Sequence, residues 1–570
     1  MAADNGSPRR DHTPSAAIAP SIPSKRTLED DHVPAVPSPL NPDAKTLQKP
    51  QVQIQTPEET QAMSREKRAK KDSLKKREAK GTAPAGQDSS RSTPDPKRVN
   101  QTGTELAPMR YLLAPPKPSD FEQSRGPVFT SHHEVQGPDG QSIEFFESSE
   151  HVFNKKNYHY THCIADPAFP AIFYYRQTEP EPYGVHMSFE DTASHIYFDK
   201  AGRHVTSDKG FRMSRANVAV REGRWYWECK VTRGMLKERK EGDPLSHGHV
   251  RIGFARREAP LDAPVGFDAY SYGLRDAQGQ KVHMSRPKDF FPPGEDIYEG
   301  DVIGLEIQLP SESLHRKVVN GQFNPAVDLL DEEADKSIEA PNIIRDRLPI
   351  RFKSNIYFEK IDYHPTKELE DLMNPSPMAP KSAEAPNPNH ALAPLRTLPK
   401  SHIKVYRNGV LMGTPWTNLL AFLPPASKLQ QQSANSGREC LDDGSLGYSP
   451  AVSVFRGGAV EVNFGPDFWF PPPGLEETRE EDVEMKDADA PEQATATVTL
   501  PDQPKLRPVS ERYDEQIVED IVYDVIDEVG FWMSDGGKVR DRSGKGDKGG
   551  EVPGLLPGGR EEIKELVQDD

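Results

Sequence analysis

The sequence predicts an antiparallel β-sandwich, because between about residues 107 and 470 short runs rich in β-branched and aromatic residues recur while long helical periodicity is absent. Turn-forming pairs separate several of these runs: Asn-Gly at 320–321 and 408–409, and Gly-Gly at 457–458. The commonest two-residue hairpin turn needs positive φ at both central positions, which Asn and Gly tolerate best. We therefore predict a hairpin at each pair, and two packed sheets built from such hairpins.

Seven runs have the length and composition of strands and mark the main domain, residues 195–470. They are WYWECKV (225–231), HVRIGFA (249–255), VIGLEIQL (302–309), RFKSNIYFE (351–359), HIKVYRNG (402–409), AVSVFR (451–456) and AVEVNF (459–464). The aromatic-rich residues 107–194 are expected to extend the sandwich or to cover an edge. Two interruptions, Pro-rich 374–400 and Ser-, Gln- and Gly-rich 424–448, are expected to be exposed loops, which are tolerated because loop-closure entropy grows slowly with length. They lie inside the domain, since strands resume after each.

Composition indicates one folded domain with long segments that do not fold alone. The 570 residues include 55 prolines, only 34% are hydrophobic, and the mean hydropathy is -0.76. Residues 1–106 are predicted to be disordered, because they cannot bury enough apolar surface to offset the loss of chain entropy. No apolar run approaches the ~20 residues of a membrane helix, and the N-terminus lacks the apolar core of a secretory signal.

A basic cluster lies within this N-terminal arm. Residues 64–81 carry nine Lys or Arg against three acidic residues. Such a cluster is typical of a nuclear localisation signal or of a contact with DNA phosphates, and a solvated charged helix is the plainer alternative. The net charge of -17 argues against the whole chain being a nucleic-acid binder. The candidate contacts are Lys67, Arg68, Lys70, Lys71, Lys75, Lys76 and Arg77.

The stretch 249–286 begins as a strand and continues as a loop dense in aromatic and basic side chains. Connecting loops are usually rich in Gly, Asn, Asp and Ser, whereas aromatic residues and Arg dominate binding hot spots. The stretch therefore favours a recognition surface. The alternative is that the aromatic residues fill a β-core and the arginines line its rim. The residues concerned are Arg251, Arg256, Arg257, Phe267, Tyr270, Tyr272, Arg275 and Lys281.

The C-terminal part contains a predicted amphipathic helix, residues 510–532, between an acidic Pro-rich linker, 471–509, and an expected disordered tail, 533–570. Ser510 is placed to cap the helix and Gly530 to end it. A helix of this kind is marginal alone, so it docks either on its own sandwich or in the groove of a partner. Its apolar side chains form two adjacent columns, Tyr513, Ile517, Ile521, Val525 and Val529 in one and Val518, Val522 and Ile526 in the other.

The sequence predicts neither a catalytic site nor a cofactor. It contains no P-loop, Rossmann glycine pattern or nucleophile elbow. His247 and His249 form an H-x-H pair without a third ligand at metal-binding spacing, so we expect no metal there. The cysteines Cys163, Cys229 and Cys440 are far apart and give no indication of a zinc finger or a disulfide framework.

Several of these motifs, taken in order, resemble the SPRY (B30.2-like) β-sandwich: VREGRWYWECKV, VRIGFA, GDVIGLEI, VYRNGVLMG and VNFGPDFWFPP. The loop APLDAPVGFDAYSYGLRDAQGQKVH, followed by SRP, and the segment RFKSNIYFEK are more specific. They resemble the SPRY subunit of the COMPASS and trithorax-type histone methyltransferase complexes, named Bre-two in yeast and Ash-two in animals. The resemblance spans about 195–470 and 511–530. It is of the fungal type, since this chain lacks the cysteines of the zinc-bearing region in the animal relatives.

The resemblance implies a nuclear, non-catalytic scaffold that supports methylation of lysine 4 of histone H3, with any contact to nucleosomal DNA left to the basic arm. In the family, the SPRY domain binds an acidic segment of the β-propeller subunit next to the SET-domain enzyme, and the matching positions are Arg251, Pro264, Phe267 and Arg275. The usual aromatic in animals is Tyr, so Phe267 keeps the ring but lacks the hydroxyl. The family's C-terminal helix binds a small dimeric helical subunit of the Dpy-thirty/Sdc type, and the matching positions are Tyr513, Ile517, Val518, Ile521, Val522, Val525 and Val529.

Two other functions stay open. A SPRY domain can be the substrate-recognition adaptor of a ubiquitin ligase or of another complex, which normally brings a RING, B-box or SOCS box. An RNA-associated SPRY protein would be expected to carry an RGG or SAP segment. Because the sequence contains none of these companions, the methyltransferase scaffold is the preferred function.

Overall fold

The computed structural model describes the part of the chain that carries the predicted domain and helix. The described residues are 113–137, 140–155, 157–166, 175–238, 244–329, 343, 345, 347–375, 384–429, 442–475, 504–535 and 563–566. The basic arm at 64–81, like the rest of residues 1–106, lies outside them. Within the described ranges, no helix is both long and apolar enough to span a bilayer.

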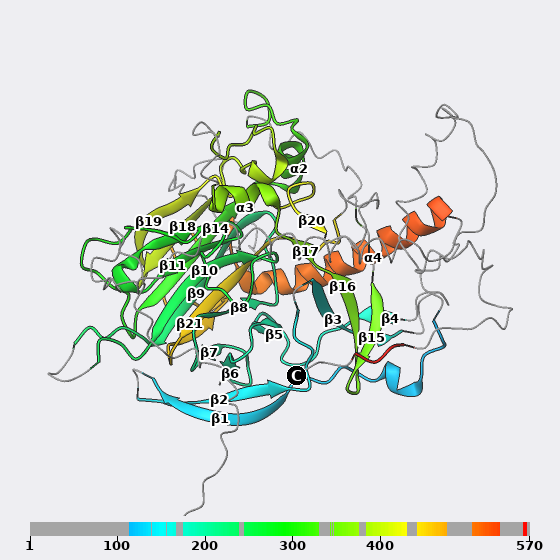
Figure 1. The fold of residues 1–570 in the computed structure, drawn as a ribbon, viewed down its shortest axis with the longest axis horizontal. Coiled ribbons are helices and arrows are strands. Elements are labelled where there is room, and N and C mark those ends of the chain that lie inside the picture. Colours follow the sequence, from blue (N-terminus) through cyan, green and yellow to red (C-terminus); the bar gives the residue numbers. More distant parts are fainter. Residues whose placement is uncertain are drawn as a thin grey trace, which may run out of the picture. The chain divides into compact units, whose positions relative to one another are not determined.

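Two large sheets form the body of the domain (Figure 1). The order of the larger is β1 (Val128–Gln136), β2 (Ser142–Ser149), β6 (Tyr197–Phe198), β7 (His204–Thr206), β22 (Ala459–Asn463), β9 (Gly223–Arg233), β14 (Val302–Leu309), β18 (His402–Arg407) and β19 (Val410–Thr417), with β23 (Leu506–Pro508) also pairing with β9. The order of the smaller is β13 (Arg286–Lys288), β12 (Lys281–His283), β11 (Ser271–Arg275), β10 (His249–Arg256), β21 (Tyr448–Phe455), β8 (Arg212–Ala216) and β5 (Met187–Thr192). All neighbours pair antiparallel except β23, which runs parallel to β9.

The two sheets enclose one hydrophobic core. Trp227 of β9 meets Phe254 of β10 edge to face, with ring centroids 6.1 Å apart. On the other face of β9, Tyr226 packs with Tyr406 and Leu506, so this strand is buried on both sides. The predicted fold class, a mainly antiparallel β-sandwich followed by a C-terminal helix, is confirmed.

The remaining elements form two small sheets and short helices. A four-stranded sheet has the order β15 (Leu348–Phe352), β16 (Asn355–Ile361), β3 (Tyr158–Ala165) and β4 (Tyr175–Gln177), and β17 (Tyr363–His364) pairs with β20 (Lys428–Leu429). The α-helices are α2 (Glu312–Asn320), α3 (Lys367–Met373) and α4 (Arg512–Asp535), and the 3-10 turns are η2 (Pro118–Phe121), η3 (Ala277–Gly279), η4 (Ala393–Leu395) and η6 (Val509–Glu511).

One of the three predicted hairpin turns is a hairpin. Asn408 and Gly409, at φ 50° and 81°, join β18 to β19. At 320–321 the prediction is wrong: Gly321, at φ 73°, ends α2 and donates its N–H to two carbonyls of the last turn. At 457–458 it is also wrong, because β21 and β22 belong to opposite sheets. There Gly458 allows a close backbone approach, since a Cβ would lie 2.4 Å from the His249 carbonyl oxygen.

Two other segments lie partly or wholly outside the sandwich. The run 351–359 is a hairpin, β15 and β16, and pairs with β3 outside the sandwich. Strands from residues 107–194 join three different sheets: β1 and β2 extend the larger, β5 closes the smaller, and β3 and β4 lie in the four-stranded sheet. The aromatic richness of this region therefore reflects several sheet surfaces at once.

The expected loops and tail include packed segments. Within 374–400, Leu398 is buried in the main core, and within 424–448, Leu446 is buried there as well. In the tail, residues 563–566 lie extended beside β15, where the Arg351 N–H donates to the Lys564 carbonyl at 2.9 Å. In each of the two predicted loops, the packed residue is an isolated leucine in an otherwise polar segment, and this is the sequence feature that accompanies its burial.

Candidate protein-binding surfaces

The strands β10 and β11 place two arginines directly opposite each other. Arg251 and Arg275 are a register pair of this antiparallel ladder, and both side chains are half-buried. The Arg251 guanidinium lies over the Phe211 ring at 4.8 Å and reaches the Val265 carbonyl at 3.4 Å. Nε of Arg275 donates to the Ala277 carbonyl at 3.2 Å. The sequence-predicted pair is thus assembled on a rigid ladder.

The positive charge of this pair is only partly offset by the nearby Asp276 carboxylate. Burial and the neighbouring charge of Arg275 lower the pKa of Arg251 to about 10. Among the described residues, neither arginine forms an ion pair, and Nε of Arg251 is buried without a hydrogen-bond partner. The nearby Asp276 carboxylate instead accepts from His249 and from the Val250 amide, both at 3.0 Å. Because like charges directly opposite on paired strands are destabilising, a carboxylate bound here would be favoured.

The loop between these strands holds Pro264 and Phe267 beside the pair. A turn joins them, in which the Phe267 N–H donates to the Pro264 carbonyl at 3.0 Å. The Val265 N–H donates to Oγ of Ser453 at 2.9 Å, and Oγ of Ser285 donates to the Phe267 carbonyl at 2.7 Å. Phe267 is 50% exposed. The loop is therefore fixed in advance and presents an aromatic ring to solvent, which lowers the entropy cost of binding.

The other aromatic and basic residues of this stretch pack or form hydrogen bonds within the domain. For these side chains the second interpretation, a filled β-core, describes the structure better than a recognition surface. Tyr270, Tyr272 and Arg257 are buried, and the Lys281 ammonium donates to the Pro415 carbonyl at 2.5 Å. Arg256 is also buried, and its chemistry is described next. Sequence alone cannot separate the exposed Phe267 from the buried tyrosines, because all are aromatic residues in one loop.

Arg256 and Glu258 form a buried ion pair beneath the loop, and Arg256 also donates to Ser427 Oγ at 2.7 Å. We expect Glu258→Ala to lower the free energy of unfolding by about 3–5 kcal/mol, because it leaves a buried guanidinium without its carboxylate. Chemical denaturation of the purified chain measures this loss. Asp262→Ala, at an exposed carboxylate in the same loop, should change the value by less than about 0.5 kcal/mol. Equal effects of the two substitutions would contradict the role given to the pair.

Asp268 gives the loop a pH dependence. Its carboxylate accepts from the Tyr270 N–H at 2.9 Å and from Oγ of Ser271 at 3.1 Å, yet burial raises its pKa from 3.8 to about 6. The folded state therefore favours the protonated form, and the stability that this adds is complete below pH 3.8 and is lost as the pH rises through about 6.

We expect Asp268→Asn to remove this loss. The unfolding free energy of the variant should rise relative to wild type by at most about 3 kcal/mol between about pH 4 and about pH 7.5. Urea denaturation at both pH values measures the difference. A constant difference across the range would show that Asp268 does not titrate as described.

Helix α4 presents its apolar side chains to solvent. It begins at Arg512 and passes through Gly530 to Asp535 as one continuous helix, orange in Figure 1, so the predicted end at Gly530 is wrong. Ser510 lies in η6, where its N–H donates to the Phe464 carbonyl at 2.9 Å. Tyr513 packs partly against the sandwich core. The other predicted contact residues are 39–60% exposed: Ile517, Val518, Ile521, Val522, Val525 and Val529.

The opposite, acidic face of α4 docks on the chain's own domain. Asp520 pairs with Arg345 at 2.6 Å, and Asp524 pairs with Arg347 at 2.5 Å. Burial alone would raise the pKa of Asp520, but the charges of Arg347 and Arg345 lower it below its usual value. Tyr523 is buried beneath the Arg345 guanidinium, 5.3 Å from its ring. The helix therefore lies on its own domain through the polar face, and the apolar face is left open.

Arg345 and Arg347 are functional candidates that the sequence did not indicate. They lie far from α4 along the chain, and the acidic face of the helix is the only sequence feature that calls for a basic partner. A second unpredicted cluster consists of His151, His162 and Glu190, which share no local motif. The H-x-H pair behaves differently, because His247 contacts Glu299 while His249 contacts Asp276.

Comparison with known proteins places this chain in a family. The chain matches no family model. It is 62% identical over 581 residues to the COMPASS component cclA of Colletotrichum higginsianum, with 100% of each chain covered. It is 37% identical to the Set1 complex component ash2 of Schizosaccharomyces pombe, over 76% of this chain and 54% of the relative.

A crystal structure of a human SPRY domain is similar over 48% of this chain and 98% of that chain, with 13% identity and a TM-score of 0.23. The family assignment does not rest on that likeness. It rests on sequence identity over an alignment that covers the whole of both chains. The chain belongs to the Ash2/Bre2 (Ash-two/Bre-two) family of COMPASS, or Set1 complex, components.

Proposed function

We propose that this chain is a non-catalytic scaffold subunit of a Set1-type COMPASS complex, and that it supports methylation of lysine 4 of histone H3 in the nucleus. The observation that carries the proposal is the full-length identity to a relative named as a COMPASS component. A scaffold needs surfaces for at least two partners. The exposed loop beside the arginine pair and the open face of α4 are two such surfaces on one chain.

The first surface is proposed to bind an acidic segment of the β-propeller subunit next to the SET-domain enzyme. Arg251 and Arg275 offer two guanidinium groups that lack carboxylate partners among the described residues. Guanidinium groups bind carboxylates with two parallel hydrogen bonds, and a fixed Pro264–Phe267 turn adds apolar contact at low entropy cost. An acidic peptide with an apolar residue beside its carboxylates fits this surface.

The second surface is proposed to bind the small dimeric helical subunit of the Dpy-thirty/Sdc type. Helix-in-groove binding uses apolar side chains at three- and four-residue spacing, and the open face of α4 has this spacing. The acidic face is held by Arg345 and Arg347, so the helix is already folded and oriented before the partner arrives. This prior order reduces the folding cost that a free helix would add to binding.

The basic arm at 64–81 is proposed to direct nuclear import or to contact nucleosomal DNA. An electrophoretic mobility shift with nucleosomal DNA tests the contact, and neutralising Lys67, Arg68, Lys70 and Lys71 should weaken it. A shift that the neutralised arm leaves unchanged would end this part of the proposal.

A reconstituted methyltransferase assay tests the scaffold function itself. The SET enzyme and the β-propeller subunit are assayed on histone H3 with and without the full chain. We expect the rate of lysine 4 methylation to rise when the chain is added, and the chain alone to have no activity. If the chain binds the other subunits but leaves the methylation rate unchanged, its proposed role in supporting methylation is refuted.

A further inference from the structure

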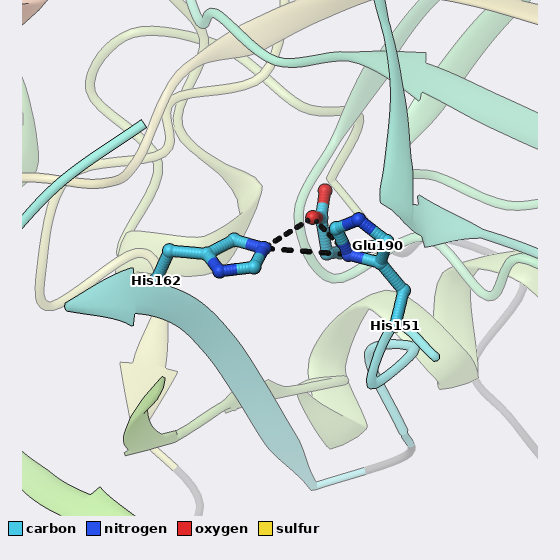
Figure 2. A group of neighbouring side chains, drawn as sticks. All are labelled: His151, His162 and Glu190. Carbon is cyan, nitrogen blue, oxygen red and sulfur yellow. Dashed lines mark hydrogen bonds and ion pairs between the residues drawn. The ribbon is translucent and has the colours of Figure 1, made fainter. Parts of the chain in front are cut away.

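Two buried histidines and one glutamate converge at a single point. Figure 2 shows both imidazole rings turned toward one carboxylate oxygen of Glu190. Nδ1 of His151 lies 2.7 Å from this Oε1 and Nε2 of His162 lies 3.0 Å from it. The two ring nitrogens are 3.3 Å apart. Three potential ligand atoms from three side chains therefore form one small triangle.

The triangle joins separate parts of the fold. His162 lies on β3 of the four-stranded sheet, and Glu190 lies on β5 of the seven-stranded sheet. His151 lies in the segment between β2 and β3. Both histidines are buried, and Glu190 is 17% exposed. A group bound at this point would tie the four-stranded sheet to the sandwich.

We propose that His151, His162 and Glu190 bind one divalent transition-metal ion of the Zn²⁺ class, which fastens these elements together. Zn²⁺ takes His nitrogen and carboxylate oxygen ligands at about 2.0–2.2 Å in a tetrahedron, whose ligand atoms lie about 3.3 Å apart. The nitrogen–nitrogen separation already has this value, and the nitrogen–oxygen separations of 2.7 and 3.0 Å would have to open by roughly 0.6 and 0.3 Å. Two imidazoles and one carboxylate also suit Zn²⁺ better than Ca²⁺ or Mg²⁺, which prefer oxygen ligands.

The free space beside the site agrees with this assignment. His162 and Glu190 line a cavity of about 160 Å³, which has room for a water molecule as the fourth ligand.

The test uses the full chain after treatment with a chelator. Titration with ZnCl₂ in a calorimeter should give one site per chain, and Co²⁺ in its place should give the visible absorption bands of a four-coordinate ion. We expect Glu190→Gln and His162→Gln to weaken zinc binding by at least about tenfold. Zinc at about a hundredfold excess over the wild-type Kd should raise the thermal unfolding midpoint of the wild type by several degrees, and should raise that of Glu190→Gln by at most about half as much.

The control is His204→Gln. His204 also lies between two carboxylates, Asp199 at 3.3 Å and Glu461 at 3.7 Å. Zinc that binds nonspecifically to a histidine beside carboxylates would therefore bind there equally well. This variant should bind zinc as the wild type does. A wild type without stoichiometric zinc binding or cobalt bands would overturn the proposal, whether or not the variants fold, and would leave a hydrogen-bonded His–Glu–His cluster. Equal weakening in the control would overturn it as well. Neither result bears on the scaffold function.

Discussion

Replacing Arg251 and Arg275 together by alanine should weaken binding of the acidic partner segment by at least about a hundredfold. Truncating one partner of a desolvated charge pair costs about 2–5 kcal/mol, and about 2.7 kcal/mol corresponds to a hundredfold change in Kd. The two guanidinium groups lie on a rigid ladder beside a fixed turn, so they meet the partner in a fixed geometry. Calorimetric titration of the purified chain with the acidic segment of the β-propeller subunit measures the change.

The same double substitution should leave the fold intact. Relief of the repulsion between the two charges that face each other across β10 and β11 should offset the loss of the Arg251 contacts with Phe211 and Val265, so the free energy of unfolding should change little. The matched control is Arg286→Ala with Lys288→Ala, which removes two exposed positive charges from β13 of the same sheet. That pair should weaken binding by less than about threefold at physiological salt. If both double variants weaken binding equally, the interaction is a diffuse charge effect and the assigned site is wrong.

Placing charge on the open face of α4 should abolish binding of the dimeric helical subunit. In Ile521→Glu with Val525→Glu, two carboxylates would have to be buried in an apolar groove, which costs several kcal/mol and weakens binding by at least about a hundredfold. Both side chains are about half exposed in the free chain. The thermal unfolding midpoint of the chain should therefore stay within about 2 °C of the wild type. Size-exclusion chromatography and titration calorimetry with the purified dimer measure the loss of binding. Thermal denaturation of the free variant measures its unfolding midpoint.

A matched change elsewhere separates this site from general apolar attraction. Val410 and Leu411 are exposed apolar residues that follow the Asn408–Gly409 turn, and Val410→Glu with Leu411→Glu adds the same charges there. This control should bind the dimer as tightly as the wild type. Loss of binding in the control, or retention of binding in the α4 variant, would contradict the assignment of the helix face.

The sequence predicted an element correctly where the residues of that element and its neighbours along the chain determine its structure. The run WYWECKV becomes β9 because its aromatic residues can be buried on both faces of a central strand. The Asn-Gly pair at 408–409 becomes a hairpin because its neighbours pair with each other. The same dipeptide at 320–321 ends a helix, because Leu314, Val318 and other residues before it bury one helical face. A positive φ is therefore predictable locally, whereas the element that it terminates depends on distant packing.

The candidate sites also combine features that the local sequence predicts with features that depend on distant residues. The amphipathic pattern of α4 predicted a helix with one apolar face, but it could not say which face would meet the domain, because Arg345 and Arg347 are brought there by the fold. Phe267 and Tyr270 are equivalent in sequence terms, and only the turn at Pro264 and the packing of the loop expose one and bury the other.

The measurement that tests the account most directly is affinity purification of the tagged full chain from its own cells, followed by mass spectrometry. The wild type is compared with the Arg251→Ala, Arg275→Ala variant and the Ile521→Glu, Val525→Glu variant. We expect the wild type to recover a SET enzyme, a β-propeller protein and a small helical subunit. The arginine variant should lose the first two and keep the third, and the α4 variant should do the reverse. A wild type that recovers no methyltransferase subunit would contradict the proposed scaffold function, and losses that do not separate would contradict the two independent surfaces.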